Sequence, residues 1–334
     1  MSTLIPFSVI IEKTLKEKRL WDYYNANFTG VNSKEFILNF VQSSGKEQIS
    51  LYEDLEQMKS QPRLDHILNT FILGIYLYKE HKHLHSQINR EIVRYKRLND
   101  SISFEYIWFL ICFFHDSGYE VEEQSKNHID YISKIIEELQ QVHLKNPSGV
   151  PRLYKNVYLS YLFYKRDQLK CLDHGIYAGI HLYYELCRIR KKKDDEKDGN
   201  LRWSENLINV YNYVAWIVLA HNIFFIDGGK EGETRNYKKY HLDSLITSQK
   251  IIKRSRHPVF FLFCLVDTIE PIKVLRKKDL LSNVLFSIDN KSLIIKLLKA
   301  GGECKSDYMK RVCDLNKWLT PVTKAEADSV IIKI

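Results

Sequence analysis

The sequence is poor in the two residues that most often interrupt helices. Its 334 residues include 13 glycines and seven prolines, while several long segments repeat apolar residues at helical spacing. The 21 tyrosines and 16 phenylalanines argue against a disordered chain. We therefore expect a mostly helical, globular protein.

Three further absences limit where the protein is expected to act. The six cysteines contain no C-x-x-C pair, and several lie in apolar helical stretches, so we expect reduced core thiols. The longest uncharged apolar runs, 106–114 and 258–266, are nine residues each, against about 20 for a membrane span. The N-terminal "MSTLIPFSVIIEK" lacks a basic start and a small-residue cleavage site. These features predict a cytoplasmic protein without a membrane partner.

The charge balance favours an anionic partner. The formal net charge is +9, which suits a nucleotide, another phosphorylated small molecule or a nucleic acid. The basic residues are nevertheless spread along the chain, and "RIRKKK" (188–193) is followed directly by "DDEKD". A generic solvated surface is therefore favoured over a true anion-attracting face, and no oligomeric state can be inferred.

Helical spacing of apolar residues divides the chain into segments. Residues 1–60 are expected to form a helical lead-in, and residues 281–334 a small α+β appendage. There, "NVLFSI", "KSLIIKLLKA", "YMKRVCDLNKWL" and "DSVIIKI" are predicted as strand, helix, helix and strand. The glycine-containing segments 191–200 and 227–240 are predicted as loops, the second flexible and basic. Between the two ends we expect helices over 63–80, 103–116, 127–142, 152–170, 173–191, 204–223 and 258–273, with Asp173 as an N-cap and Pro258 in a first turn.

One short stretch, "FFHDSGYE" (113–120), sets the functional question. An apolar helix arrives at His115 and Asp116 side by side, and a buried carboxylate costs several kcal/mol unless it is paired. Imidazoles and carboxylates recur in apolar helical contexts along the chain, 46 to 58 residues apart, which suits successive helices returning to one point. Together they are typical ligands for Zn, Mn, Fe, Ni or Co, and a cation would compensate the charge of Asp116. The candidate metal ligands are His66, His115, Asp116, His174, His221 and Asp267.

This order of residues resembles the HD-domain superfamily of metal-dependent phosphohydrolases. "HDSGY" stands where that superfamily has its His-Asp doublet, and "RLDHILNTFILGIYL", "LDHGIYAG", "LAHN" and "FCLVDTIEP" are similar to its other motifs. The resemblance implies an all-α bundle with a metal centre over residues 61–280. It implies one metal held by His66, His115, Asp116 and Asp267, and a second held by Asp116, His174 and His221. Two departures from some relatives are the Ser117-Gly118 pair after the doublet and the lack of a "GYP" triplet after His174.

The implied activity is hydrolysis of a phosphate ester of a nucleotide-type substrate by a metal-activated hydroxide. A phosphodiesterase is favoured by the six-ligand order; a dNTP or other nucleotide hydrolase and a non-catalytic metal- and nucleotide-binding sensor are the alternatives. A nuclease ranks lower, because no run interleaves aromatic and basic residues. We expect His115, Asp116 and Arg63 to act in catalysis, although Arg63 could instead pair with Asp65 or Glu80. The expected substrate-binding residues are Arg63, His181, Lys230 and Lys273.

Overall fold

The described part of the chain is mostly helical, with a small antiparallel sheet. The computed structural model describes residues 3–17, 32–98, 101–193, 201–226, 228–246, 251–272, 278–289, 292–298, 302–320, 323–326 and 329–333. Two compact units are distinguished: a first unit of residues 1–39, 58–92 and 250–334, and a second unit of residues 40–57 and 93–249.

The first unit contains two long apolar helices that carry predicted ligands. Helix α4 spans Gln61–Glu80 and buries the expected stripe of Ile67, Phe71, Ile75 and Tyr78. Helix α13 spans Pro258–Ile269, and it begins at the proline as predicted, because proline lacks the N–H that would be unsatisfied there. Other helices that lie wholly or partly in this unit are α1 (Phe7–Lys16), α2 (Ser33–Ser43), α5 (Lys82–Lys96) and α15 (Gly302–Asp314).

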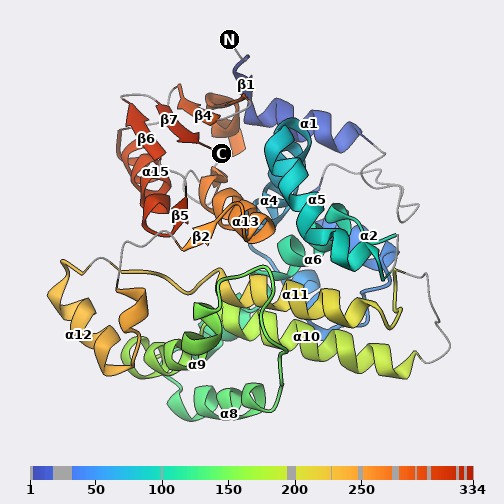
Figure 1. Cartoon of the computed structure of the whole chain (residues 1–334), viewed down its shortest axis with the longest axis vertical. Helices are drawn as coiled ribbons and strands as arrows, with labels where there is room; N and C mark the ends of the chain where they lie inside the picture. The colour runs from blue at the N-terminus through green and yellow to red at the C-terminus, as the bar shows by residue number, and fades with distance from the viewer. Residues whose placement is uncertain are drawn as a thin grey trace. The chain divides into compact units, whose positions relative to one another are not determined.

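The sheet of the first unit joins both ends of the chain. Its strand order is β1-β3-β4-β7-β6, antiparallel throughout (Figure 1). Residues 1–60 and 281–334, which we expected as separate segments, therefore share one sheet. A parallel pair of short strands, β2 (Ile252–Lys253) and β5 (Leu319–Thr320), is separate from it. The five strands are β1 (Ile5–Pro6), β3 (Val284–Ile288), β4 (Ser292–Leu297), β6 (Thr323–Glu326) and β7 (Ser329–Lys333).

The prediction of a helix for "KSLIIKLLKA" was wrong, because Ser292–Leu297 form strand β4. Along it, Leu293, Ile295 and Leu297 are buried, and the residues between them are half-buried. This period of two matches a strand with one face on the core. Pairing with β3 and β7 on either side supplies the backbone hydrogen bonds that a helix would have made locally.

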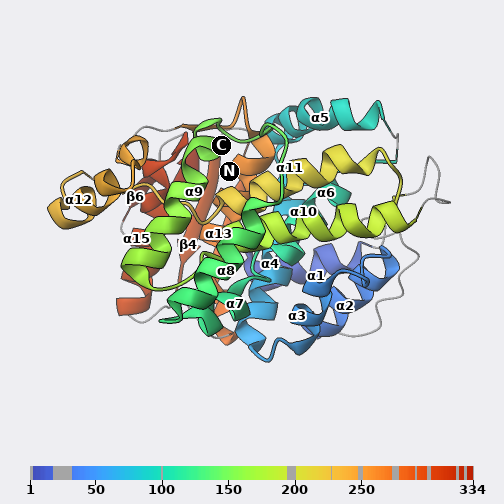
Figure 2. The same cartoon turned by 90° about the horizontal axis from the view of Figure 1, so that it is seen from below.

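The second unit is helical. Helix α11 is buried almost throughout, and α10 lies alongside it in both views of the molecule (Figures 1 and 2). Its helices are α3 (Ser50–Gln57), α6 (Phe104–Phe114), α7 (Tyr119–Ser125), α8 (Ile129–Gln140), α9 (Leu153–Tyr164, continued by a π turn over Lys165–Leu169), α10 (His174–Lys192), α11 (Leu207–Ala220) and α12 (Glu231–Lys239).

Glycine sets the close approach of α10 to α11. A Cβ atom at Gly179 would lie 2.6 Å from both the Ala215 carbonyl oxygen and the Leu219 nitrogen. Only a residue without a side chain therefore allows the two backbones to come this near. The same spacing of small residues puts Gly175 one turn earlier on α10, beside His221 at the end of α11.

The predicted loop over 227–240 is the second correction, since Glu231–Lys239 form helix α12. Acidic Glu231 and Glu233 occupy its first turn, and Lys238 and Lys239 its last, an order that complements the helix dipole. An ion pair between Arg235 and Glu231, four residues apart, adds to this. Of the predicted loop 191–200, Lys191 and Lys192 end α10, and residues 194–200 lie outside the described residues.

The free thiols agree with the prediction from the sequence. Cys112, Cys171, Cys187, Cys264 and Cys313 are free thiols, three of them buried. In the residue ranges that the structure describes, no helix combines the length and the apolar character that crossing a membrane requires.

Candidate metal centre

Helix ends bring three predicted ligands together in the second unit. His115 caps the C-terminus of α6 and Asp116 follows it, His174 opens α10, and His221 caps the C-terminus of α11. One ligand atom from each of Asp116, His174 and His221 lies within 4.8 Å of the others. Asp116 is 2% exposed and His115 fully buried. The apolar runs before His115 and His221 therefore serve to carry polar side chains into the interior.

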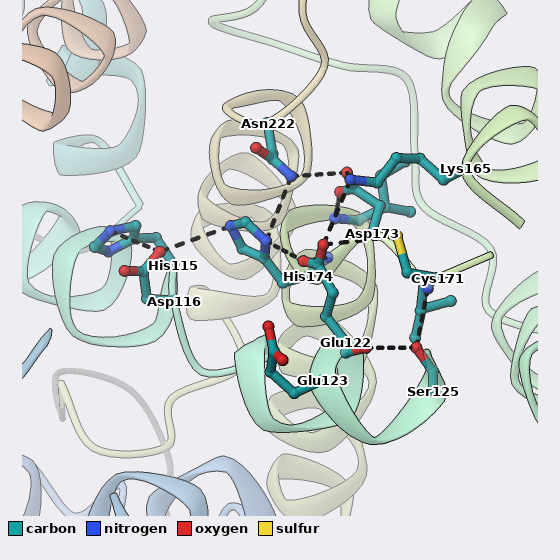
Figure 3. A network of polar contacts seen from close by, with 12 residues as sticks. His115, Asp116, Glu122, Glu123, Ser125, Lys165, Cys171, Asp173, His174 and Asn222 are labelled. Carbon is teal, nitrogen blue, oxygen red and sulfur yellow. Dashed lines mark hydrogen bonds and ion pairs between the residues drawn. The ribbon is translucent and has the colours of Figure 1, made fainter. Parts of the chain in front are cut away.

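Asp116 lies between two imidazoles. Its Oδ1 atom is 3.2 Å from Nε2 of His115 and 3.7 Å from Nε2 of His174 (Figure 3). The His221 ring is centred 5.4 Å from each of these two rings. These imidazoles surround the buried carboxylate whose partner the sequence left open.

Each histidine of this group is oriented through its other ring nitrogen. Nδ1 of His115 lies 2.7 Å from the Cys112 carbonyl oxygen, and Nδ1 of His221 lies 2.5 Å from that of Val218. A carbonyl oxygen only accepts, so each Nδ1 carries a proton, and in the neutral form of the ring Nε2 presents its lone pair. This is the form in which histidine binds metals, with a fixed outer partner.

Glu122 performs the same task for His174. Its Oε2 atom accepts from His174 Nδ1 at 2.5 Å and from the His174 backbone nitrogen at 3.2 Å. Burial raises the pKa of Glu122, but the hydrogen bond from His174, the charge of that ring and the ammonium of Lys165 together lower this pKa to about 2. Glu122 is therefore an ionised acceptor at neutral pH, which directs His174 Nε2 toward Asp116.

A second layer of contacts supports this arrangement (Figure 3). Lys165 Nζ lies 3.4 Å from Glu122 and 3.7 Å from Asp173. Asp173 is the N-cap of α10, as predicted: it accepts from the Ile176 nitrogen, and it also accepts from the Asn222 side chain at 2.8 Å. Asp173 precedes His174 and Asn222 follows His221, so their hydrogen bond connects the start of α10 with the end of α11.

Two glycines keep the space around the group clear. A Cβ atom at Gly118 would lie 2.5 Å from the His174 carbonyl oxygen, and one at Gly175 would lie 2.8 Å from His221 Cε1. Real Cβ atoms do not approach so closely, so larger residues would displace the ligands. The glycines in "HDSG" and "DHG" are therefore part of the site.

The first unit holds the other two predicted ligands that the structure pairs. His66 on α4 and Asp267 on α13 are in contact, with Nε2 and Oδ1 3.0 Å apart. Glu270 accepts from the other ring nitrogen of His66 at 2.8 Å, from Asn69 at 2.9 Å and from the Ile272 nitrogen at 3.0 Å. The six predicted ligands thus fall into two groups of His and acidic residues, one in each unit, and both groups have a donor set that suits a metal ion.

The structure describes the positions of three of the four remaining candidates. Arg63 is half-buried in the first turn of α4, three residues before His66. His181 is half-buried on α10, with Nε2 2.8 Å from Ser50 Oγ. Lys230 is exposed at the start of α12 and pairs with Glu233 at 3.5 Å. Lys273 lies outside the described residues.

Sequence reasoning missed both carboxylates that orient imidazoles. Glu270 follows Asp267 by three residues, one helical turn, in "VDTIEP", and that spacing was the available signal. Glu122 follows Asp116 by six residues in "HDSGYEVEEQ", where Glu120 and Glu123 are equally plausible by spacing. Only the turn between α6 and α7 distinguishes Glu122 from its neighbours.

The two groups differ from a thiolate site in their chemistry. Imidazole nitrogens and carboxylate oxygens suit Mn, Fe, Zn, Ni or Co, and none of the free cysteines is needed. Comparison of the chain with family models, with curated proteins and with solved structures gave no match. The assignment to a superfamily therefore stays a prediction from the ordered motifs of this chain.

Proposed function

We propose that the chain is a metal-dependent phosphohydrolase of the HD-domain type, which cleaves a phosphodiester of a nucleotide-type substrate. The observation that carries the proposal is the meeting of Asp116, His174 and His221 in the second unit within 4.8 Å. The fixed Nδ1 atoms of its histidines support the proposal further, since this orientation has a clear use in metal binding.

The donor set fits divalent transition metals. Asp116 offers a second carboxylate oxygen besides Oδ1, which suits the bridging role that the resemblance implies for it. His66 and Asp267 form a further ligand pair in the first unit. The resemblance joins this pair to His115 and Asp116 in one two-metal centre.

The chain's own residues have defined tasks in this proposal. Metals bound by such ligands lower the pKa of a water molecule and neutralise phosphoryl oxygens. Glu122 keeps the Nδ1 proton on His174, so that Nε2 remains a donor to the metal. Lys165 compensates the charges of Glu122 and Asp173. Arg63 is proposed to contact a phosphate, for which a guanidinium is well suited.

The proposal is tested by metal content and hydrolysis in matched variants. Asp116→Asn removes a ligand while preserving shape, and Asp243→Asn removes an exposed carboxylate of the same unit. After reconstitution with Mn²⁺, each protein is analysed by elemental mass spectrometry. Each is then incubated with bis-p-nitrophenyl phosphate, cyclic mono- and dinucleotides, nucleoside triphosphates and a short oligonucleotide.

Removal of a hydrogen-bond partner of a metal ligand lowers metal affinity by up to roughly 100-fold. We expect Asp116→Asn, which removes a ligand itself, to lower the affinity by more than this and to abolish hydrolysis. Asp243→Asn should behave as wild type. Cleavage of triphosphates alone would favour a nucleotide hydrolase over a phosphodiesterase. Retained hydrolysis in Asp116→Asn would contradict the proposed centre. Metal binding by wild type without any product would favour the non-catalytic metal- and nucleotide-binding sensor.

A further inference from the structure

A groove of about 1000 Å³ runs along the second unit between helices α8 and α10. Helix α8 lies below α10 in Figure 1, and both belong to the same unit. The volume is at the upper end of the range for small-molecule sites. Aromatic and basic side chains line much of it, among them Tyr131, Lys134, Tyr177, His181, Tyr184 and Lys191.

Helix α10 contributes a row of aromatic side chains to the groove. Tyr177 and His181 are stacked, with centroids 5.2 Å apart and planes 10° apart, and His181 and Tyr184 follow at 6.5 Å. Ser50 holds the His181 ring at its Nε2 atom. Tyr184 is 47% exposed, and Tyr131 on α8 is 43% exposed. His181 and Tyr177 are half-buried, whereas Tyr184 and Tyr131 are accessible. Accessible aromatic rings are the feature on which nucleobases stack.

The charges in the groove favour a polyanion. Lys134, Lys191 and Lys192 are exposed there, and the acidic residue that lines it is Glu138. Arg188 also lines the groove, but its guanidinium already donates twice to Glu185. Three lysines beside a row of rings match a ligand in which phosphates alternate with aromatic bases.

One end of the groove adjoins the candidate metal group. Tyr177 lies one turn after His174 on α10, and its ring is 3.1 Å from where a Cβ of Gly118 would be, two residues after Asp116. Lys192, at the other end, is about four turns further along α10, or about 22 Å at 1.5 Å per residue. At the 3.4 Å spacing of stacked nucleotides, this length holds about six of them.

We propose that this groove binds a single-stranded nucleic acid and leads its phosphodiester backbone toward Asp116, His174 and His221. The bases stack on the accessible rings of Tyr184 and Tyr131, and the lysines bind phosphates. The inference rests on the proposed function for the cleavage of the bound strand, but the binding itself requires no metal. The proposed substrate is thus a polynucleotide strand, although nucleic acid ranked below single nucleotides among the partners expected from the sequence.

The test is fluorescence anisotropy with the full chain and a fluorescein-labelled 12-nucleotide single strand, as DNA and as RNA, in EDTA. Tyr184→Ala should weaken binding by about 5- to 150-fold, the effect of losing one stacking platform. Lys191→Ala/Lys192→Ala should lower the slope of log affinity against log salt by about 1.4, since single strands contribute about 0.7 per phosphate contact. Lys82→Ala/Arg90→Ala is the matched control: both residues are exposed on α5 and the charge change is the same.

The inference is overturned if the control pair weakens binding as much as the groove pair, if Tyr184→Ala has no effect, or if a duplex binds as tightly as the single strand. Asp116→Asn separates the two proposals. Groove-dependent binding without hydrolysis sensitive to Asp116→Asn would sink the proposed function alone. Hydrolysis of bis-p-nitrophenyl phosphate that is lost in Asp116→Asn, without groove-dependent binding, would sink this inference alone.

Discussion

The two units of the chain each place a histidine between two carboxylates, but they do so with different spacing. In the first unit, His66 contacts Glu270 at 2.8 Å and Asp267 at 3.0 Å. In the second, His174 contacts Glu122 at 2.5 Å, while its other nitrogen is 3.7 Å from Asp116. The first imidazole is engaged on both sides, whereas the second is engaged on one side and directed at a carboxylate beyond hydrogen-bond distance.

This difference determines what a metal ion has to displace. Both contacts of His66 are hydrogen bonds to acceptor-only groups, so a proton lies between Nε2 and Asp267. A cation that binds His66 and Asp267 must replace that proton. His174 and Asp116 hold no such bond, and their geometry is set by helix ends and glycines. The group in the second unit is therefore the better prepared of the two candidate metal groups.

The largest expected effect comes from the helix contact that carries the second group. Gly179→Ala puts a Cβ 2.6 Å from backbone atoms of α11, and overpacking of this kind costs about 1–3 kcal/mol. We expect a lower unfolding midpoint in urea and weaker metal binding by the second group. Gly232→Ala on α12, where a Cβ meets nothing within 4 Å, should instead stabilise by about 0.5–1 kcal/mol. Equal effects of the two substitutions would show that close α10–α11 packing is unimportant.

Removing the orienting carboxylates should weaken metal binding by about 10- to 100-fold. Glu122→Gln frees the His174 ring, and Glu270→Gln frees the His66 ring. Competition with a chelating dye measures the affinity of each variant. Glu123→Gln is the matched control, because Glu123 is exposed on the same helix as Glu122 and pairs with Lys126. An affinity for Glu122→Gln as high as that of the control would refute the orienting role.

A smaller effect is an acid-sensitive step in the first unit. Burial, with help from Arg256 and Lys253, lowers the pKa of His257 from 6.5 to about 4, at the N-terminus of the helix that carries Asp267. His257 therefore takes up a proton more readily in the unfolded chain than in the folded chain. The free energy of unfolding is highest above pH 6.5 and decreases as the pH falls toward 4.

We expect this loss to be on the order of 1 kcal/mol after allowance for partial exposure. His257→Gln should remove it from urea unfolding curves of the metal-free protein measured between pH 7 and 4. The exposed His128→Gln, in the second unit, is the matched control. An unchanged pH profile in His257→Gln would assign the step to other groups.

The smallest effect directly addresses the comparison of the two metal groups. His221→Ala removes a ligand of the second group but keeps Asp116, and Asp267→Asn removes a ligand of the first group. Calorimetric titration with Mn²⁺ in buffers of different ionisation enthalpy counts the protons released. We expect about one more proton from the first group than from the second, because of the contact between His66 and Asp267. Equal counts would mean that the shorter distance in the first unit has no consequence for metal binding.

Residue patterns within one segment predicted the helices well where pairing with other segments did not change the outcome. Asp173 as an N-cap, Pro258 in a first turn and the buried stripe of α4 follow from short-range chemistry, and the structure confirms them. Ser292–Leu297 became a strand because two neighbouring strands pair with it, which no single segment encodes. The charges of helix Glu231–Lys239 complement its dipole, a signal outweighed in the sequence by the three glycines of residues 227–240.

The sequence by itself determined the composition of the candidate centre: which imidazoles and carboxylates follow apolar runs, and hence the class of metal they suit. Only the tertiary structure decided which of them meet, since Asp116, His174 and His221 come from three helix ends. It also decided that Glu122, and not Glu123, orients His174, and that rings and lysines from two separate helices line one groove. Contacts of this kind depend on distances between segments far apart in the chain, which side-chain periodicity within one segment does not contain.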